Sequence, residues 1–285
     1  MRSLLIHLRL HFQMLLAPLF LWGYALGGGE ITVSLAIAFI AFHVFLYGGI
    51  TAFNSAYDRD EGPVGGLYAP PPVSPWLMPF SVVVQSMGAL LVALVSFQTL
   101  VVYLLMVGFG AAYSHPSLRW KSSPASALPT IAIGQGVLGF LAGLSMTPLG
   151  LASVDLTLGV GAVAAALVVT GFYPLSSLFQ IEEDRRRGDH SVAVAWGVSA
   201  AFRLAIGAFL FAAPLLAFAA WRRFELADAL LLAAGMVILA FAVAIWRRAF
   251  DPAAVRRNFL IAMRLNAAAS GGFAAYLIWR IVGGT

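Results

Sequence analysis

The chain has 285 residues, of which 61% are hydrophobic and only 10% are charged. Soluble domains contain roughly 45–50% apolar and about 25% charged residues, so a water-soluble fold of this length would have too little polar side chain to cover its surface. This composition excludes a soluble enzyme, a disordered protein, a coiled coil and a nucleic-acid binder. The absence of cysteine excludes disulfides and cysteine metal sites. The net charge of +5 is expected to face an anionic membrane surface.

The first residues, 2–11, predict an amphipathic helix that lies at the membrane interface, ahead of the first long apolar run. No small-residue cleavage site indicates a signal peptide. His7 and His11 are four residues apart on the expected helix. This spacing has two interpretations, a metal-binding pair or a stripe that faces the lipid headgroups, and we favour the second.

Nine apolar segments follow, each long enough to cross a bilayer as a helix of about 20 residues. Their apolar runs are continuous, whereas the strands of a membrane β-barrel alternate apolar and polar residues. The expected fold is therefore all-α: a single membrane-embedded domain over residues 1–285, with nine transmembrane helices around a central lipid-accessible cavity. The spans are expected at residues 12–28, 31–57, 76–96, 98–115, 125–147, 153–175, 195–221, 226–248 and 258–281.

The basic residues predict the orientation of this bundle. With the N-terminus in the cytoplasm and the C-terminus outside, 14 of the 17 lysines and arginines lie at cytoplasmic helix ends and loops, as the positive-inside rule requires. The pair Arg222–Arg223 is the one discordant place. We therefore expect a multi-pass protein of the inner or plasma membrane.

The acidic residues are more concentrated still, because seven of the 12 occur in two cytoplasmic loops. The first loop follows a helix whose polar residues share one face at 3.6 residues per turn. That face comprises His43, Tyr47, Ile50, Asn54, Asp58 and Glu61. Polar groups inside a membrane face the bundle interior or a wet cavity. The stripe predicts one wall of a pocket with an acidic mouth facing the cytoplasm.

Three features in or after this stripe are His43, Asp60 and the segment 62–75. His43 is interpreted as a hydrogen-bonded packing residue rather than a catalytic one. Asp60 points about 100° away from Glu61 if the helix continues, and ranks below it as a ligand. Residues 62–75 contain five prolines and three glycines and cannot continue the helix. They form either an ordered loop over the mouth or a stiff connector.

The second acidic loop places Gln180, Glu183, Asp184 and Arg187 on one helical face. The alternative is a charged loop that only supports itself through pairs such as Glu182 with Arg186. Between the fourth and fifth spans, residues 113–124 carry a basic loop.

In this basic loop, Arg119 and Lys121 either set the topology or bind phosphate. Hard oxygen ligands select Mg²⁺, which binds through carboxylates and substrate phosphates. Two acidic clusters and a basic loop at one membrane face predict a Mg²⁺–diphosphate clamp above an apolar cavity.

At these residues the chain resembles the UbiA superfamily of intramembrane prenyltransferases, over essentially its whole length. The first motif of that family is N-x-x-x-D-x-x-x-D. Asn54 and Asp58 match it, whereas Gly62 replaces the last aspartate. The second is D-x-x-x-D, in which Gln180 replaces the first aspartate and Asp184 matches. Residues 173–197 and 113–124 also resemble the corresponding regions of the family.

The resemblance implies Mg²⁺-dependent transfer of an isoprenyl group from an isoprenyl diphosphate to an aromatic or lipid-like acceptor. The implied catalytic residues are Asn54, Asp58 and Asp184, and the metal ligands are Asp58, Glu61, Gln180, Glu183 and Asp184. Glu61 and Glu183 are expected to compensate for the two missing aspartates. The implied substrate-binding residues are Arg119, Lys121, Tyr113, Tyr173, Arg187 and Asp189. Either tyrosine would stabilise a carbocation through its π face, with packing as the alternative.

Two other functions stay open because each motif lacks a carboxylate. A membrane terpene synthase would cyclise or hydrolyse the diphosphate with no acceptor, and a lipid-binding relative would have no activity. A transporter is disfavoured, since no interrupted helix pair recurs in two halves of the chain. The glycine-rich run at 134–143 fits close helix packing instead.

Overall fold

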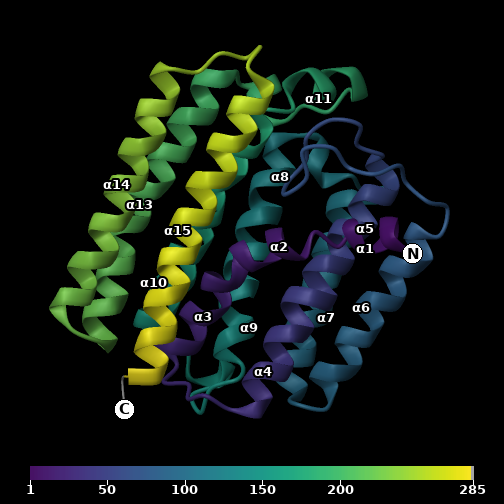
Figure 1. Ribbon diagram of the computed structural model, residues 1–285. Helices are drawn as coiled ribbons and strands as arrows, with labels where there is room; N and C mark the ends of the chain where they lie inside the picture. The colour runs from purple at the N-terminus through teal and green to yellow at the C-terminus, as the bar shows by residue number, and fades with distance from the viewer. Residues whose placement is uncertain (284–285) are drawn as a thin grey trace.

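The computed structural model describes residues 1–283, and this part of the chain is almost entirely helical (Figure 1). The first rod is broken and consists of α1 (Arg2–Ile6), α2 (Leu10–Gln13), η1 (Met14–Leu16) and α3 (Ala17–Leu26). The next rods are α4 (Val33–Ile40) with η2 (Ala41–Leu46) and α5 (Tyr47–Asp58), then α6 (Leu77–Ala93) and α7 (Phe97–Ser114). After η3 (Trp120–Ser122) come α8 (Pro124–Ile131), η4 (Ala132–Val137) and α9 (Leu138–Leu144), and then η5 (Leu151–Ser153) and α10 (Leu156–Ser177). The short helices α11 (Ile181–Arg187) and α12 (Val192–Ala195) precede α13 (Val198–Arg223), α14 (Leu226–Arg248) and α15 (Val255–Gly283).

The described residues contain seven helical stretches that are long and apolar enough to cross a membrane. The apolar helix α6 is shorter, and α15 carries three arginines in its first half. Large apolar side chains such as Leu90, Phe211 and Ile238 are exposed on the outside, as a lipid-facing surface requires. The chain is an all-α, multi-pass membrane protein. The count of nine spans and the N-in orientation stay predictions.

Two glycines explain how the broken first rod packs into the bundle. A Cβ atom on Gly23 of α3 would lie 1.9 Å from the carbonyl oxygen of Phe140 in α9. The reciprocal atom on Gly143 would lie 1.8 Å from the carbonyl oxygen of Phe20. Only glycine permits two helix backbones to approach this closely. The close packing expected for the glycine-rich run is thus confirmed.

The N-terminal segment departs from the interfacial helix that was expected. In Figure 1, α1 and α2 run across the bundle, and His7, Arg9 and Gln13 are only 1%, 4% and 1% exposed. The helix breaks because Arg9 adopts a left-handed backbone, with φ of 51°. The shared helical face on which both interpretations of His7 and His11 depended does not exist, so both are wrong. His11 instead bonds through Nε2 to the Gly66 carbonyl, at 2.7 Å.

Residues 59–76 form an ordered cover over this N-terminal segment. Val64 and Leu67 exchange two backbone hydrogen bonds, of 2.8 and 2.7 Å. Gly65 and Gly66 pack so closely on Phe12 that a Cβ atom at either position would lie within 2.8 Å of that ring or its Cβ. Of the two alternatives for this loop, the ordered one is correct.

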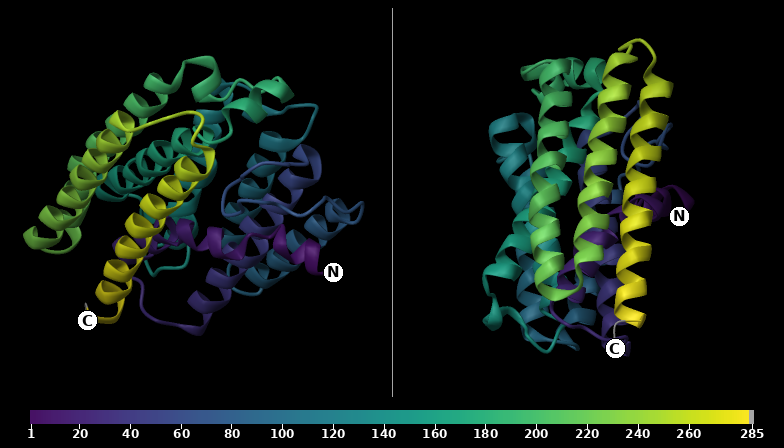
Figure 2. Two further views of the ribbon diagram at one scale, coloured as in Figure 1. Left: turned by 45° about the horizontal axis from the view of Figure 1, so that its top comes forward. Right: turned by 90° about the vertical axis from the view of Figure 1, so that its left-hand side faces the viewer.

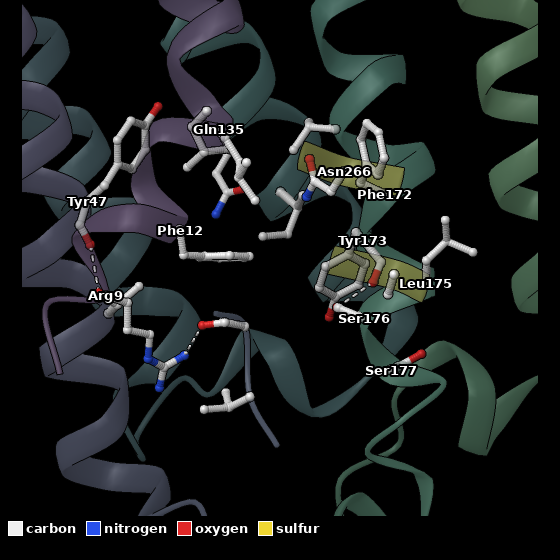
Figure 3. A pocket seen from close by; sticks show the side chains of 18 of the residues that line it. Arg9, Phe12, Tyr47, Gln135, Phe172, Tyr173, Leu175, Ser176, Ser177 and Asn266 are labelled. Carbon is white, nitrogen blue, oxygen red and sulfur yellow. Dashed lines mark hydrogen bonds between the residues drawn. The ribbon is translucent and has the colours of Figure 1, made fainter. Parts of the chain in front are cut away.

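His43 packs in the bundle, as expected. It is fully buried, bonds through Nδ1 to the Phe39 carbonyl at 2.9 Å, and stacks on the Phe39 ring with centroids 4.1 Å apart. Its segment η2 is π-helical, as is η4. Such turns are rare and occur often at functional sites. Here η4 turns Gln135 towards the central cavity (Figure 3).

The long helices form two groups, α13–α15 on one side and α4–α7 on the other (Figure 2), and a central cavity lies between them. Between them, α10 packs against α13, and α3 packs against α9 and α15. The walls come from both groups, because residues of α5, α7, α14 and α15 all line the cavity. The expected arrangement of helices around a cavity is confirmed.

Candidate functional site

The central cavity has a volume of about 280 Å³, and the charged residues that line it gather at one end. Its apolar wall includes Leu19, Val168, Met236 and Phe273. Figure 3 shows Arg9 and Tyr47 on one side of it and Phe172 and Tyr173 on the other. The polar end is formed by Arg9, Asn54, Asp58, Asp60, Lys121, Gln180, Asp184, Arg187 and Asp189. We call this end the mouth.

The first acidic segment reaches the mouth through Asp58 and Asp60. Helix α5 ends at Asp58 because Arg59 adopts a left-handed backbone, with φ of 51°. This reverses the expected ranking of the two residues that follow. Glu61 is exposed and does not line the cavity, whereas Asp60 is only 8% exposed and does. The expectation for Glu61 was wrong because it required the helix to continue.

Asp60 lies between two arginines. Arg187 Nη1 donates to its Oδ1 at 2.7 Å, and Arg9 Nη2 lies 3.5 Å from its Oδ2. Burial raises the pKa of Asp60, and repulsion from Asp58 adds to this rise, while the two arginines oppose it. Arg9 also donates to Ser55 Oγ, at 2.6 Å. The sequence did not reveal Arg9, because one arginine before an apolar run is also the ordinary signal of topology.

The basic loop lies against Asn54 and Asp58, as predicted. Lys121 forms an ion pair with Asp58, and its Nζ donates to Asn54 Oδ1 at 2.9 Å. Ser114 Oγ donates to the same oxygen at 2.8 Å, which fixes the Asn54 amide. The lysine side chain is 8% exposed and the aspartate side chain 7%. This pair is therefore desolvated, and its charge-assisted contacts are stronger than those of an exposed pair.

Arg119 joins the basic loop to the second acidic segment. Its Nη2 donates to both carboxylate oxygens of Asp189, at 2.8 and 2.9 Å, and its Nη1 lies 3.9 Å from Asp58. The backbone N–H of His190 donates to the Ser122 carbonyl at 3.0 Å. The basic loop and the second acidic segment therefore form one side of the mouth.

The second acidic segment presents Gln180, Asp184 and Arg187 to the cavity, but not Glu183. The carboxylate of Glu183 instead faces residues 61 and 62 and forms an ion pair with Arg187. Burial raises the pKa of Asp184 to about 7, and repulsion from Asp189 and Glu183 adds to this, while Ser191 and Arg187 oppose it. Within residues 1–283, no ion pair neutralises Asp184.

The two tyrosines lie together at the cavity wall. Tyr113 Oη donates to Tyr173 Oη over 3.3 Å, and both residues line the cavity. They come from α7 and α10, the helices that end nearest the basic loop and the second acidic segment. Their position allows contact with the part of a ligand that lies directly below the mouth.

No three histidine or carboxylate groups of the described residues cluster closely enough to hold a metal by themselves. The donors at the mouth nevertheless fit Mg²⁺ by chemistry, since Asp58, Gln180 and Asp184 offer hard oxygen atoms. Asp184 carries the specific indication, because a partly buried carboxyl without an ion-pair partner is the group that a divalent cation would stabilise in its ionised form. Mg²⁺ with few protein ligands also leaves room for phosphate oxygens.

Several solved structures of other proteins are similar in fold to this chain. A structure of a UbiA homologue from Archaeoglobus fulgidus bound to GPP and Mg²⁺ is similar, with a TM-score of 0.71, 21% identity and coverage of 96% of this chain and 99% of that one. The same homologue bound to DMAPP and Mg²⁺ gives a TM-score of 0.69 at 20% identity, with the same coverage. A structure described for digeranylgeranylglyceryl phosphate synthase in membranes gives 0.65 at 14% identity, over 97% and 98% of the two chains.

These structural likenesses show the fold. No curated protein sequence matches the chain. The decisive comparison is with protein families, in which residues 16–268 match the UbiA prenyltransferase family. That match covers both acidic segments, the basic loop and most of the helices that line the cavity. The chain therefore belongs to the UbiA prenyltransferase family.

Proposed function

We propose that this protein transfers an isoprenyl group from an isoprenyl diphosphate to a hydrophobic or aromatic acceptor within the membrane, with Mg²⁺ as cofactor. The observation that carries the proposal is the division of the cavity into a charged mouth and an uncharged, mostly apolar interior. A diphosphate with a hydrocarbon tail has the same division. The relatives bound to GPP or DMAPP together with Mg²⁺ support this assignment.

The basic loop binds the diphosphate in this proposal. Arg119 offers a planar fork and Lys121 a compact charge, and both suit phosphate oxygens. Each now contacts a carboxylate, Asp189 for the arginine and Asp58 for the lysine. Substrate binding therefore exchanges carboxylate contacts for phosphate contacts. Asp58 keeps Lys121 desolvated, and Asp189 holds the partly exposed Arg119 in orientation, until the donor arrives.

Asp58 and Asp184, with the amide oxygen of Gln180, would hold Mg²⁺ between the two acidic segments. Asn54 orients Lys121 beside them, at 2.9 Å. Bound at this place, Mg²⁺ would neutralise the negative charge that grows on the leaving diphosphate. Glu183 and Glu61 take no direct part in this proposal, since Arg187 and residues 61 and 62 hold the carboxylate of Glu183, and Glu61 is exposed.

The remaining residues handle the organic part of the reaction. The C–O bond of the donor breaks and its electron pair leaves with the diphosphate, so the allylic carbon becomes cationic. Tyr113 and Tyr173 present π systems to this carbon and stabilise it, and the apolar wall excludes water that would trap it. The nucleophile of the acceptor then forms the new bond and releases a proton.

The test uses purified protein in lipid nanodiscs, labelled geranyl diphosphate and a panel of phenolic, quinol and lipid-alcohol acceptors. We expect labelled product with at least one acceptor, only with Mg²⁺, and none from Asp58→Asn. Asp155→Asn, an exposed carboxylate paired with Arg223 far from the cavity, is the matched control and keeps activity. A labelled hydrocarbon formed with donor alone would support a terpene synthase. Absence of Mg²⁺-dependent donor binding would support a lipid-binding relative.

We also propose that the mouth faces the cytoplasm, as the distribution of basic residues indicates. The chain has no cysteine, so single cysteines report topology without background. In intact cells, an impermeant thiol reagent should label Ser153→Cys, at the opposite end of the bundle, and spare Arg186→Cys beside the mouth. Both positions are exposed. Labelling of Arg186→Cys alone would show that the mouth faces the outside, contrary to this proposal.

A further inference from the structure

The two acidic segments meet where the first one lacks a side chain. A Cβ atom on Gly62 would lie 2.6 Å from Oε2 of Glu183, which is closer than non-bonded atoms approach. Backbone φ does not require glycine at this position, since Gly62 is not among the residues with positive φ. The carboxylate of Glu183, delivered from α11, therefore occupies the space into which a side chain at position 62 would project.

This carboxylate is held by groups from both segments. Glu183 Oε1 accepts the backbone N–H of Glu61 at 3.0 Å and that of Gly62 at 3.4 Å. It also forms an ion pair with Arg187, whose other terminal nitrogen donates to Asp60 at 2.7 Å. Glu183 is 7% exposed. A buried carboxylate with these partners is satisfied, and losing it would leave two backbone donors and Nη2 of Arg187 without their acceptor.

The contacts of Glu183 with residues 61 and 62 lie next to the carboxylates of the mouth. Residues 59–62 directly follow Asp58 and include Asp60, and both aspartates line the cavity. On the opposite side, Asp184 and Gln180 belong to the same short helix as Glu183 and Arg187, with Gln180 as its N-cap. A tie between α11 and residues 61–62 therefore fixes the distance between the carboxylates of the first segment and those of the second.

We propose that Glu183 supplies, from the second acidic segment, the carboxylate that position 62 of the first segment lacks. With Arg187 it locks residues 59–62 onto α11, so Glu183 is a positioning residue rather than a metal ligand. There is space for only one carboxylate. An aspartate at position 62 requires a small side chain at position 183, and a glutamate at position 183 requires glycine at position 62. This inference rests on the proposed function of the mouth, but the tie itself exists without metal or substrate.

The experiment is a double-mutant cycle in nanodiscs with Glu183→Ala, Gly62→Asp and the combined variant. Two measurements are made on each protein: Mg²⁺-dependent binding of geranyl diphosphate, and amide hydrogen exchange of residues 59–66 without Mg²⁺. Glu182→Ala is the matched control, because Glu182 is the exposed neighbour that pairs only with Arg185. Far-UV circular dichroism and the melting temperature show whether each variant is folded.

We expect each single variant to bind the donor about tenfold or more weakly, since about 1.4 kcal/mol corresponds to tenfold, and to exchange faster over residues 59–66. The combined variant should recover binding to within about threefold of the wild type, because the carboxylate introduced at position 62 then takes the place of the lost one beside Arg187. Strictly additive losses in the combined variant would overturn the proposal. So would unchanged exchange in Glu183→Ala.

A direct metal-ligand role for Glu183 gives a different result: weaker Mg²⁺-dependent binding with normal exchange of residues 59–66 in the metal-free protein. If the wild type binds no geranyl diphosphate, the proposed function fails, whereas the exchange measurement still decides whether the tie exists.

Discussion

Two carboxylates at opposite ends of the bundle, the buried Asp228 and the partly buried Asp184, show how differently the same chemical group is used. Asp228, at the start of α14, accepts from Arg280 Nε at 2.9 Å, from Tyr276 Oη at 2.9 Å and from the Glu225 backbone N–H at 2.9 Å. Asp184, at the mouth, has no ion pair within residues 1–283 and lines the cavity. A buried charge with all its partners is part of the structure, whereas one without them is available for a ligand.

The surroundings of Asp228 are closed, whereas those of Asp184 are open. Arg280 also lies 5.3 Å above the Phe224 ring and 5.0 Å from that of Trp279, so the Asp228 cluster closes on itself with aromatic cover. It joins the beginning of α14 to the end of α15. The mouth instead has acids and bases from three segments around an open cavity. Substitutions in the two places should therefore have opposite effects on stability and activity.

The largest effect is expected from Asp184→Asn. Asparagine keeps the shape but removes the charge that would bind Mg²⁺, so transfer should fall by at least about a hundredfold, as removal of one electrostatic catalytic group does. The melting temperature should stay the same or rise, because the substitution removes a partly buried charge that has no ion pair. Product formation per folded protein and thermal melts measure both. Substantial activity in this variant would contradict the assignment of Asp184.

Asp228→Asn should show the opposite pattern. The change leaves the partly buried Arg280 without its carboxylate, which costs about 1–3 kcal/mol of unfolding free energy, and the melting temperature should fall. Transfer per folded molecule should be unchanged, since Asp228 does not line the cavity. A normal melting temperature together with lost activity would break the comparison on which this account depends.

A smaller, graded effect is expected from pH. Burial raises the pKa of Asp184 to about 7, from 3.8. Mg²⁺ binds the ionised form, so Mg²⁺-dependent donor binding should weaken by up to about tenfold for each pH unit below 7. Asp184→Asn removes this dependence. Binding isotherms between about pH 5.5 and 8 would show it, and a flat profile in the wild type would contradict the environment assigned to Asp184.

The same group has the reverse effect on stability without metal. Its folded-state pKa lies above its unfolded-state value, so the folded protein binds the proton more tightly. The contribution of Asp184 to the unfolding free energy is therefore least favourable above about pH 7 and improves as pH falls towards 4. Comparing metal-free melts of the wild type and Asp184→Asn isolates this contribution from the other carboxylates.

The sequence predicted the helical membrane bundle, the cavity and the meeting of Asn54, Asp58, Lys121 and Asp184, because periodicity and charge distribution are local properties. It failed wherever the backbone left the helix. Because Arg59 adopts a left-handed backbone, Asp60 rather than Glu61 is buried at the mouth. Because Arg9 also adopts a left-handed backbone, the N-terminal segment that was expected at the membrane interface is buried in the bundle.

The contact of Glu183 with residues 61 and 62 shows a second limit. Helical offsets placed Glu183 beside Asp184, but they do not reveal that a carboxylate turns towards a loop 121 residues away. Only the packed structure brings the two acidic segments together. The sequence shows that position 62 is glycine, but it does not show that Glu183 occupies the space beside it.

The most direct test of the central claim is the titration of geranyl diphosphate into the wild-type protein and Asp184→Asn, in nanodiscs at about pH 8, with and without Mg²⁺. The account predicts that the wild type binds the diphosphate tightly only with Mg²⁺, and that Asp184→Asn loses the Mg²⁺-dependent part while staying folded. Equal, metal-independent binding by the two proteins would contradict it.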